Sequence, residues 1–471
     1  MTSNERFEEG GAAVVDTRPP LADGAPGQKP AQRVFLLLQG PQSPFFRRLG
    51  DALQRAGAQV VKVNFCGGDV LLWARRDALS YRGTESGWPL WVARLMRERG
   101  VTDLLAFGLW RPLHWEAALL ARQMGIRVFS MDEGYLRPNY ITLEEGGNNG
   151  RSLLPHLPEE ISAMAALAPD PPPPQQADNP LTSRFWYAVG NYHFGNVLLF
   201  PKFFHYRTHR PYCVVSELKG WFVRVLKLLF GGERRDKRRW KRFAESGTPY
   251  FLFPLQLDAD SQVRLYSPFS GMLEAIGEII GSFARSADPE LHLIVKNHPL
   301  DNGLIDYRSF VRSFARAYGV EKRVHFLDIG LPGSFCRDTA KLFGVEKYIH
   351  FAEHNESAAM TGRSRGVVVL NSTMGLAALQ QGKPVYCVGR SIYAMPGLAQ
   401  AEPFCQLEHF WTDPVGPDPQ LLKDFVKVVK TRALVNGNFY SREGIAQAVR
   451  HSLERLGMSQ PSPEESQKAR G

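Results

Sequence analysis

The sequence predicts an α/β protein made of two Rossmann-like, doubly wound halves that face a central cleft. Short patterns typical of buried strands alternate with helical patterns in both halves, and this alternation indicates parallel sheets covered on both faces. A proline-rich stretch, PDPPPPQQADNP at 169–180, separates the two series. The chain has 471 residues, 44% of them hydrophobic, which is enough for two well-filled domains.

In the first half, four segments have the composition of buried strands: 33–39 (RVFLLLQ), 59–65 (QVVKVNF), 103–108 (DLLAFG) and 127–131 (RVFSM). A helix is predicted from Phe45 to a stop at Gly57. No GxGxxG motif is present, so we do not expect a dinucleotide site.

The second half repeats the alternation, with strands predicted at 250–256 (YFLFPLQ), 292–297 (HLIVKN), 324–328 (VHFLD), 366–371 (GVVVLN) and 385–389 (VYCVG). Aromatic and basic residues between the halves break the pattern and predict an insertion. The expected organisation is a disordered tail (1–31), a first domain (32–167), a linker with the insertion (168–247), a second domain (248–457) and a disordered tail (458–471).

The formal net charge is +10, and seven of the nine residues from Arg234 to Arg242 are basic. Such a run can meet an anionic membrane, a phosphorylated substrate or nucleic acid, or form a solvated helix face. Nucleic-acid binding is not expected, because the run lies outside any nucleic-acid-binding motif. No stretch approaches the roughly 20 apolar residues of a membrane span, and five scattered cysteines indicate reduced thiols in the cytoplasm.

Polar motifs follow four of the predicted strands. Asp132, Glu133 and Gly134 follow the strand at 127–131, and the paired carboxylates could act as a general acid or base, or simply as turn residues. Asp260 follows the strand that ends at Gln256 and could be a nucleophile or a charge stabiliser. With Asp258 it also spells DxD, a metal-binding pattern, although both could merely cap a helix.

The other two motifs suggest an anion site. Lys296 lies near the end of the predicted strand 292–297, which is followed by His298 and Pro299, and His298 could contact a phosphate leaving group or be structural. The last motif places Ser372 and Thr373 at a helix N-terminus, which could bind an anion or only cap the helix. Four such motifs at strand ends together indicate group transfer from an anionic donor.

Several stretches make the sequence resemble the capsule polysaccharide biosynthesis and export family. They run in order from about Arg33 to Ser441: FLLLQGPQSPFFRRLGDAL, NFCGGDVLLW, DEGYLRPNYIT, PLQLDADSQVRLYSPF, KNHPLDNG, NSTMGLAALQQGKPVYCVGRSIYAMPGL and LVNGNFYS. The acidic-Gly, His-Pro and Ser/Thr motifs also match those of bacterial sialyltransferases, which use a related CMP-ketose donor.

The resemblance implies a GT-B-like, retaining β-Kdo transferase that uses CMP-Kdo and needs no metal or other cofactor. The implied acceptor is lysophosphatidylglycerol, reached by a cytoplasmic protein peripheral at the inner membrane. Other capsule assembly or export proteins are implied partners. The first domain would then be the acceptor side and the second the CMP-sugar side.

It also implies residue roles. Asp260 would be the nucleophile, Glu133 or Asp132 the base, and His298 with Ser372 and Thr373 the groups that stabilise the leaving phosphate. Further candidates for the donor site are Gln256, Lys296, Pro299, Asn371 and Gly375, and further cleft candidates are Gly134, Arg137 and Gln39.

Two alternatives stay open: a metal-dependent UDP-sugar transferase using Asp258 and Asp260, and a non-catalytic component of capsule export. A lipid acceptor also requires membrane docking, for which the insertion offers the basic run Arg234–Arg242 and a set of aromatic residues. The aromatic set comprises Phe185, Trp186, Phe200, Phe203, Phe204, Trp221 and Phe222. The alternative is a buried aromatic subdomain.

Overall fold

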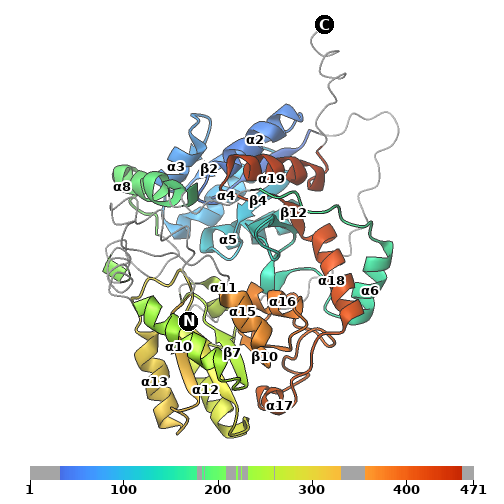
Figure 1. Cartoon of the computed structure of the whole chain (residues 1–471). Helices are drawn as coiled ribbons and strands as arrows, with labels where there is room; N and C mark the ends of the chain where they lie inside the picture. The colour runs from blue at the N-terminus through green and yellow to red at the C-terminus, as the bar shows by residue number, and fades with distance from the viewer. Residues whose placement is uncertain are drawn as a thin grey trace.

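The computed structural model describes residues 32–177, 183–184, 186–207, 219–220, 224, 232–258, 260–329 and 356–458. These residues form two α/β units, each built on a largely parallel sheet (Figure 1). The two Rossmann-like halves predicted from the sequence are therefore confirmed. The predicted tails lie outside the described residues, except for Met458. Within the described ranges, no helix has the length and apolar character needed to span a bilayer.

The first unit contains a seven-stranded sheet in the order β12-β6-β5-β4-β1-β2-β3. Its strands are β1 (Val34–Leu37), β2 (Gln59–Asn64), β3 (Leu79–Ser80), β4 (Asp103–Phe107), β5 (Arg127–Glu133), β6 (Tyr140–Glu145) and β12 (Leu434–Asn436). Strands β1 to β5 pair in parallel, whereas β6 and β12 add antiparallel at one edge. The chain leaves β1 in one direction and returns to β4 on its other side, so the topological switch point lies between β1 and β4.

Helices cover both faces of this sheet. They are α2 (Phe45–Arg55), α3 (Gly67–Trp73), η1 (Glu85–Gly87), α4 (Trp88–Glu98), α5 (Pro112–Gln123) and α19 (Arg442–Arg455). Buried residues of α2 and α19 share one apolar cluster with β5 and β6, and residues of α4 and α5 form the cluster on the opposite face. Helix α2 begins at Phe45 as predicted and is followed by Gly57 at φ 86°, where a glycine fits the left-handed conformation.

The second unit has five parallel strands in the order β11-β10-β7-β8-β9. They are β7 (Tyr250–Pro254), β8 (His292–Lys296), β9 (Val324–Leu327), β10 (Gly366–Val369) and β11 (Val385–Cys387). The helices of this half are α10 (Gly232–Glu245), α11 (Ser261–Tyr266), α12 (Met272–Ser286), α13 (Tyr307–Ala317), α15 (Glu356–Arg363), α16 (Thr373–Leu379), α17 (Leu407–Thr412) and α18 (Pro419–Arg432). The switch point of this sheet lies between β7 and β10.

The last part of segment 248–457 belongs with the first unit, although the sequence analysis assigned all of that segment to the second. Strand β12 pairs with β6, and α19 packs against α2. Strand β12 has only three residues, which is too short for an alternating apolar and polar pattern to be recognised. The chain therefore crosses back from the second unit to the first near its end.

The predicted insertion at 168–247 divides between the two units. Trp240 and Phe243 of α10 pack on Tyr250 of β7, with ring centroids 5.7 and 5.5 Å apart, so α10 covers the second sheet. The segment η3 (Trp186–His193), α8 (Phe194–Leu198) and η4 (Phe200–Phe203) packs on α3 of the first unit. A Cβ on Gly67 would lie 1.9 Å from the Gly195 carbonyl oxygen, so this contact requires glycine.

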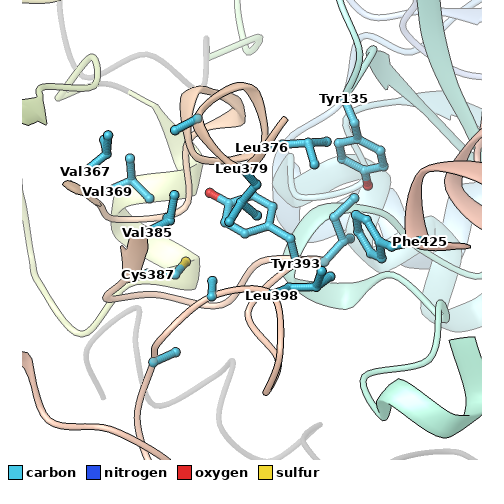
Figure 2. Close-up of a cluster of buried hydrophobic side chains, with 14 of the residues drawn as sticks. Tyr135, Val367, Val369, Leu376, Leu379, Val385, Cys387, Tyr393, Leu398 and Phe425 are labelled. Atoms are coloured by element: carbon cyan, nitrogen blue, oxygen red, sulfur yellow. The ribbon is translucent and has the colours of Figure 1, made fainter. Parts of the chain in front are cut away.

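A shared apolar cluster joins the two units. It extends from β10 and β11 through Leu376 and Tyr393 to Tyr135, which follows β5, and to Phe425 of α18 (Figure 2). Helix α6 (Pro158–Leu167) packs against α18 and η2 (Asn149–Arg151) lies beside α11, so both contacts add to this junction.

Candidate active site between the two units

Carboxyl ends of strands from both sheets bring several of the predicted residues together. Asp132 and Glu133 end β5, Asp260 follows β7, and His298 follows β8. The charge of Asp260 raises the pKa of Asp132, so these two carboxyl groups are electrostatic neighbours across the junction. Arg137 lowers the pKa of Asp132, Glu133 and His298, so it lies near all three. These five residues form one charged site.

Asp132 is held by hydrogen bonds from two directions. Its Oδ1 accepts the Glu133 backbone N–H at 2.8 Å, and its Oδ2 accepts the side-chain amides of Asn148 at 3.2 Å and Asn149 at 3.4 Å. Burial first, and then the charges of Glu133 and Asp260, raise the pKa of Asp132 from 3.8 to about 6. A carboxyl group with that pKa is ionised at neutral pH and is a stronger base than an ordinary aspartate.

The environment of Glu133 lowers the pKa of its carboxyl group, whereas that of Asp132 raises it. It accepts a hydrogen bond from the Tyr440 hydroxyl at 2.7 Å and forms an ion pair with Arg184 at 3.4 Å. Burial by itself would raise its pKa, but Arg184, Arg137 and the Tyr440 hydrogen bond outweigh burial and hold that pKa below the usual value. The pKa values of these two adjacent carboxyl groups are therefore shifted in opposite directions.

Gly134 completes the acidic motif for a steric reason. A Cβ at this position would lie 2.0 Å from the Tyr140 carbonyl oxygen, so no other residue fits while β5 and β6 stay paired. Its own carbonyl accepts a hydrogen bond from Arg137 Nε at 3.1 Å. The glycine thus lets the chain turn tightly after Glu133 and fixes the position of Arg137.

Asp260 and Asp258 play different parts in the loop after β7. Asp260 is the N-cap of α11 and accepts the Gln262 N–H at 3.0 Å. Asp258 accepts the Met272 N–H at 3.0 Å through Oδ1, and its Oδ2 pairs with Arg264 at 3.2 Å. Both oxygens of Asp258 are thereby committed to local structure. In the described part of the chain, no group of three or more His, Cys, Asp and Glu side chains could hold a metal ion.

His298 is a neutral hydrogen-bond donor set among cations. Its Nδ1 accepts the Leu300 N–H at 3.0 Å, which places the ring proton on Nε2. The pKa of His298 is lowered to about 3, by burial first and then by four nearby cations, Lys296, Arg137, Arg224 and Arg184. A neutral N–H donor within a positive field suits a phosphate group.

Lys296 is the last residue of β8, and Pro299 follows His298 in the loop after that strand. Lys296 is only 1% exposed, and burial lowers its pKa to about 8. The Pro299 carbonyl accepts a hydrogen bond from Arg224 at 3.2 Å, and Arg224 also donates to both carboxylate oxygens of Asp328. These residues position the loop that carries His298.

The motif after β10 is also largely structural. Gln256 and Asn371 exchange hydrogen bonds across the switch point of the second sheet, at 3.0 and 3.3 Å. The Ser372 hydroxyl caps α16 by accepting the Met374 N–H at 3.2 Å. A Cβ on Gly375 would lie 2.3 Å from the Tyr393 hydroxyl, so Gly375 is explained by packing.

Thr373 lines a small cavity between the units, with a volume of about 20 Å³. The first unit contributes Tyr135 and Asn149, and the second contributes Gln262, Asn371, Thr373, Leu376, Arg390, Ser391, Ile392 and Tyr393. This volume accommodates roughly one water molecule. A nucleotide sugar would therefore bind here only if the two units moved apart.

Gln39 lies outside this site. It is 3% exposed and belongs to a polar cluster at the ends of β1 and β2, where its amide nitrogen donates to Asp69 at 3.0 Å.

Three residues of the site, Tyr440, Arg184 and Arg224, were not predicted from the sequence. Tyr440 lies within LVNGNFYS, one of the stretches that carried the family resemblance, whereas the sequence around the two arginines gives no comparable signal.

Two Rossmann-like units, a site at their facing strand ends and a C-terminal helix that returns to the first unit define the GT-B class of glycosyltransferase fold. A sequence profile described as "Capsule polysaccharide biosynthesis protein" matches residues 102–346 and 335–440. The chain belongs to this family.

Two related proteins agree with that assignment. Capsule polysaccharide export protein KpsS of Escherichia coli is 32% identical over 413 residues, which cover 86% of this chain and 96% of that protein. Capsule polysaccharide modification protein LipB of Neisseria meningitidis serogroup A is 30% identical over 422 residues, covering 87% and 92%. Among solved structures, the β-Kdo 2,7 transferase KpsC of Thermosulfurimonas dismutans has 15% identity and a TM-score of 0.39, covering 90% of this chain and 100% of that one.

Proposed function

We propose that this protein is a retaining glycosyltransferase that moves β-Kdo from CMP-Kdo to lysophosphatidylglycerol. This reaction would start the lipid linker of a capsular polysaccharide. The observation that carries the proposal is the charged site between the units. Two carboxyl groups, Asp132 and Asp260, interact electrostatically, and Arg137 interacts with both Asp132 and the neutral His298. The family membership supplies the capsule context.

The proposed reaction has two displacements. In the first, an Asp260 carboxylate oxygen attacks the anomeric carbon, the bond to the CMP phosphate breaks, and CMP leaves with the bonding electron pair. His298 Nε2–H and the surrounding cations stabilise the charge on the departing phosphate. In the second, the acceptor hydroxyl attacks the same carbon, its proton passes to a base, and Asp260 is released. Two inversions give net retention.

The pKa values support Asp132 as the base. Its pKa of about 6 leaves it ionised at neutral pH yet able to bind the proton of the acceptor. Glu133 has a lowered pKa and is tied to Tyr440 and Arg184, so it is the weaker base. We propose that Glu133 fixes the geometry of the site and that Asp132 takes the proton.

We also propose that transfer needs no divalent cation. The commitment of both Asp258 oxygens to α12 and Arg264 disfavours a DxD metal site. The test is CMP release from CMP-Kdo by the purified protein with and without EDTA, with UDP-sugars plus Mn²⁺ as the comparison. CMP release that survives EDTA supports the proposal. Turnover only with a UDP-sugar and metal would establish the metal-dependent alternative.

His298→Ala is expected to weaken CMP binding by about tenfold or more, because the variant loses a hydrogen-bond donor to the phosphate. Since the pKa of His298 is lowered to about 3, CMP affinity should show no step attributable to this ring between pH 5 and 8. Isothermal titration with CMP across this pH range measures both effects. Ser372→Ala, which removes a helix cap, should lower stability more than CMP affinity. Unchanged CMP affinity in His298→Ala would mean that this histidine is only structural.

A lipid acceptor calls for docking at the cytoplasmic face of the inner membrane, and two separate surfaces could provide it. Trp186, Phe200 and Phe204 are 64%, 52% and 55% exposed on the first unit, with Phe194 at 57% beside them. Phe203 is buried, and Phe185, Trp221 and Phe222 lie outside the described residues. The basic face of α10 lies on the second unit, in the lower half of Figure 1. The predicted aromatic and basic elements therefore belong to different units.

Charge reversal at Arg234, Arg235, Arg238 and Arg239 tests the basic surface. All four are exposed on α10, and each basic residue near an anionic surface contributes about 1 kcal/mol. We expect co-sedimentation with anionic vesicles to fall and to lose its salt dependence, with activity on a detergent-solubilised acceptor retained. A Phe200→Ser, Phe204→Ser variant is the matched test of the aromatic surface. Vesicle binding equal to wild type in the charge-reversed variant would remove α10 from the docking surface.

A further inference from the structure

Each unit has a buried glutamine just after the strand that lies beside its topological switch point. Gln39 stands two residues beyond the end of β1, and Gln256 stands two residues beyond the end of β7. Both strands are the central strands beside the switch points of their sheets. Gln256 bonds to Asn371 after β10, and Gln39 accepts a hydrogen bond from Arg111, which follows β4. The first switch point thus carries an arginine where the second carries an asparagine.

The environment of Arg111 contains an unmet hydrogen-bonding group. Its guanidinium lies 5.5 Å from the ring centre of Phe107 and 5.8 Å from that of Trp110, and one terminal nitrogen is engaged by Gln39. Its Nε is buried and has no hydrogen-bond partner among the described residues. Buried donors of this kind are rarely left unpaired, so the Nε edge is suited to an anionic acceptor.

Among the described residues around Arg111, positive charge exceeds negative charge. Lys62 and Arg111 are both close enough to His114 to help lower its pKa, after burial, which keeps His114 neutral. That ring is fixed between the Gly108 carbonyl at 3.0 Å and the Gln39 backbone N–H at 3.3 Å. The buried Asp69 is the carboxylate bound to Gln39. Lys62 and Arg111 carry two positive charges and Asp69 carries one negative charge, so one bound monoanion would balance the cluster.

The aromatic segment 186–207 forms the cover of this cluster. On its inner side, the hydroxyl groups of Tyr192 and Tyr206 lie 3.2 and 3.3 Å from the Gln39 amide nitrogen. On its outer side, Phe194, Phe200 and Phe204 are more than half exposed. The same segment therefore presents polar groups toward Gln39 and apolar groups toward the surface.

The cluster also lies near the carboxylates of the candidate active site. The Gly108 N–H donates to the Met131 carbonyl at 2.8 Å, so the end of β4 adjoins the residue directly before Asp132. Doubly wound sheets bind ligands in the crevices at their switch points. A molecule bound at Arg111 can thus reach Asp132 along the edge of a single sheet.

We infer that the switch point of the first unit, at Arg111 and Gln39, binds the phosphate of the acceptor phospholipid, with the 186–207 segment beside its acyl chain. This inference rests on the proposed function for the identity of the acceptor. The phosphodiester would accept from the Arg111 guanidinium, and the headgroup hydroxyl would extend toward Asp132. Arg111 is thereby a binding residue for the acceptor and not for the donor.

Steady-state kinetics of Arg111→Gln test the inference. We expect KM for lysophosphatidylglycerol to rise at least tenfold, with KM for CMP-Kdo unchanged and kcat at saturating acceptor within about threefold of wild type. Arg111→Lys, which keeps the charge, should recover part of the loss, and Arg94→Ala, an exposed arginine on α4, is the control. An unchanged acceptor KM in folded Arg111→Gln, or an equal rise in both KM values, would overturn the assignment.

Direct binding to the wild-type protein gives a second, independent test. Lysophosphatidylglycerol should bind at least tenfold more tightly than the neutral monoacylglycerol of the same chain length, and Arg111→Gln should abolish the difference. A crystal structure of the wild-type protein with lysophosphatidylglycerol should place the phosphate on Arg111, and a phosphate bound elsewhere would refute the inference. If the protein transfers no Kdo, the proposed function fails, whereas selective binding at Arg111 would still support the anion site.

Discussion

Asp260→Asn is expected to reduce kcat by a factor of about 10³ or more, while the fold and CMP affinity stay close to wild type. The amide cannot form a glycosyl ester with the anomeric carbon, so the first displacement is lost. The fold should survive, because asparagine caps helices about as well as aspartate and Asp260 is the N-cap of α11. Transfer from CMP-Kdo, CMP titration and thermal unfolding measure the three properties.

Asp258→Asn is the matched control, two residues away in the same loop. Asp258 caps α12 and pairs with Arg264, so its loss should cost about 1 kcal/mol of stability and leave kcat within a few-fold of wild type. A DxD metal site would give a different pattern, with both variants inactive. Near-normal turnover in Asp260→Asn would remove this residue as the nucleophile.

Asp132→Asn is expected to lower kcat at neutral pH by about 100-fold or more and, at the same time, to stabilise the protein. The rate falls because no base accepts the proton of the acceptor hydroxyl. Wild-type activity should rise with pH through an apparent pKa near 6, the pKa to which burial and the neighbouring carboxylates raise Asp132. The residual activity of the variant should not show this fall in activity at acidic pH.

The stability change follows from the same pKa. Because the pKa of Asp132 is raised from 3.8 to about 6 in the folded protein, its ionisation opposes folding as pH rises through this interval. Asp132→Asn should therefore be more stable than wild type by about 1–3 kcal/mol at pH 8, and the difference should vanish below pH 4. Urea unfolding at the two pH values measures it.

Glu133→Gln provides the contrast. The pKa of Glu133 is lowered in the fold, so its ionised form supports the structure, and the neutral glutamine leaves Arg184 without its anionic partner, although its amide oxygen can still accept from Tyr440. This variant should be destabilised at neutral pH and should keep an acidic limb in its pH–activity profile, displaced to lower pH because the charge of Glu133 no longer raises the pKa of Asp132. If Glu133→Gln, and not Asp132→Asn, removed that limb, the roles of the two carboxylates would be exchanged.

The sequence identified candidate site residues where polar side chains come directly after a strand. The ends of β5, β7, β8 and β10 were recognisable from apolar runs followed by polar residues, because parallel strands align their carboxyl ends at one edge. Asp260 and His298, which follow two neighbouring strands of the second sheet, were therefore predictable as neighbours. The separation of Asp132 from Glu133 in pKa was not predictable, because it depends on Arg184 and Tyr440, about 50 and 300 residues away along the chain.

Other residues of the same motifs make structural contacts. Gln256, Asn371, Ser372 and Gly375 take part in hydrogen bonds and packing between β7, β10 and α16, and the sequence alone does not reveal these contacts. The return of β12 and α19 to the first unit was also missed. A three-residue edge strand has no periodicity to recognise, and its partner β6 lies far away in sequence.

Mass spectrometry of a lysophosphatidylglycerol acceptor incubated with CMP-Kdo and the purified protein tests the central claim most directly. The proposed function predicts a product heavier than the acceptor by one or more Kdo residues, formed in the presence of EDTA and with the first residue in the β configuration. Loss of this product in Asp260→Asn and Asp132→Asn, but not in Asp258→Asn, would tie it to the site between the units. The absence of any Kdo-bearing product from folded wild-type protein that also binds no CMP would contradict the account.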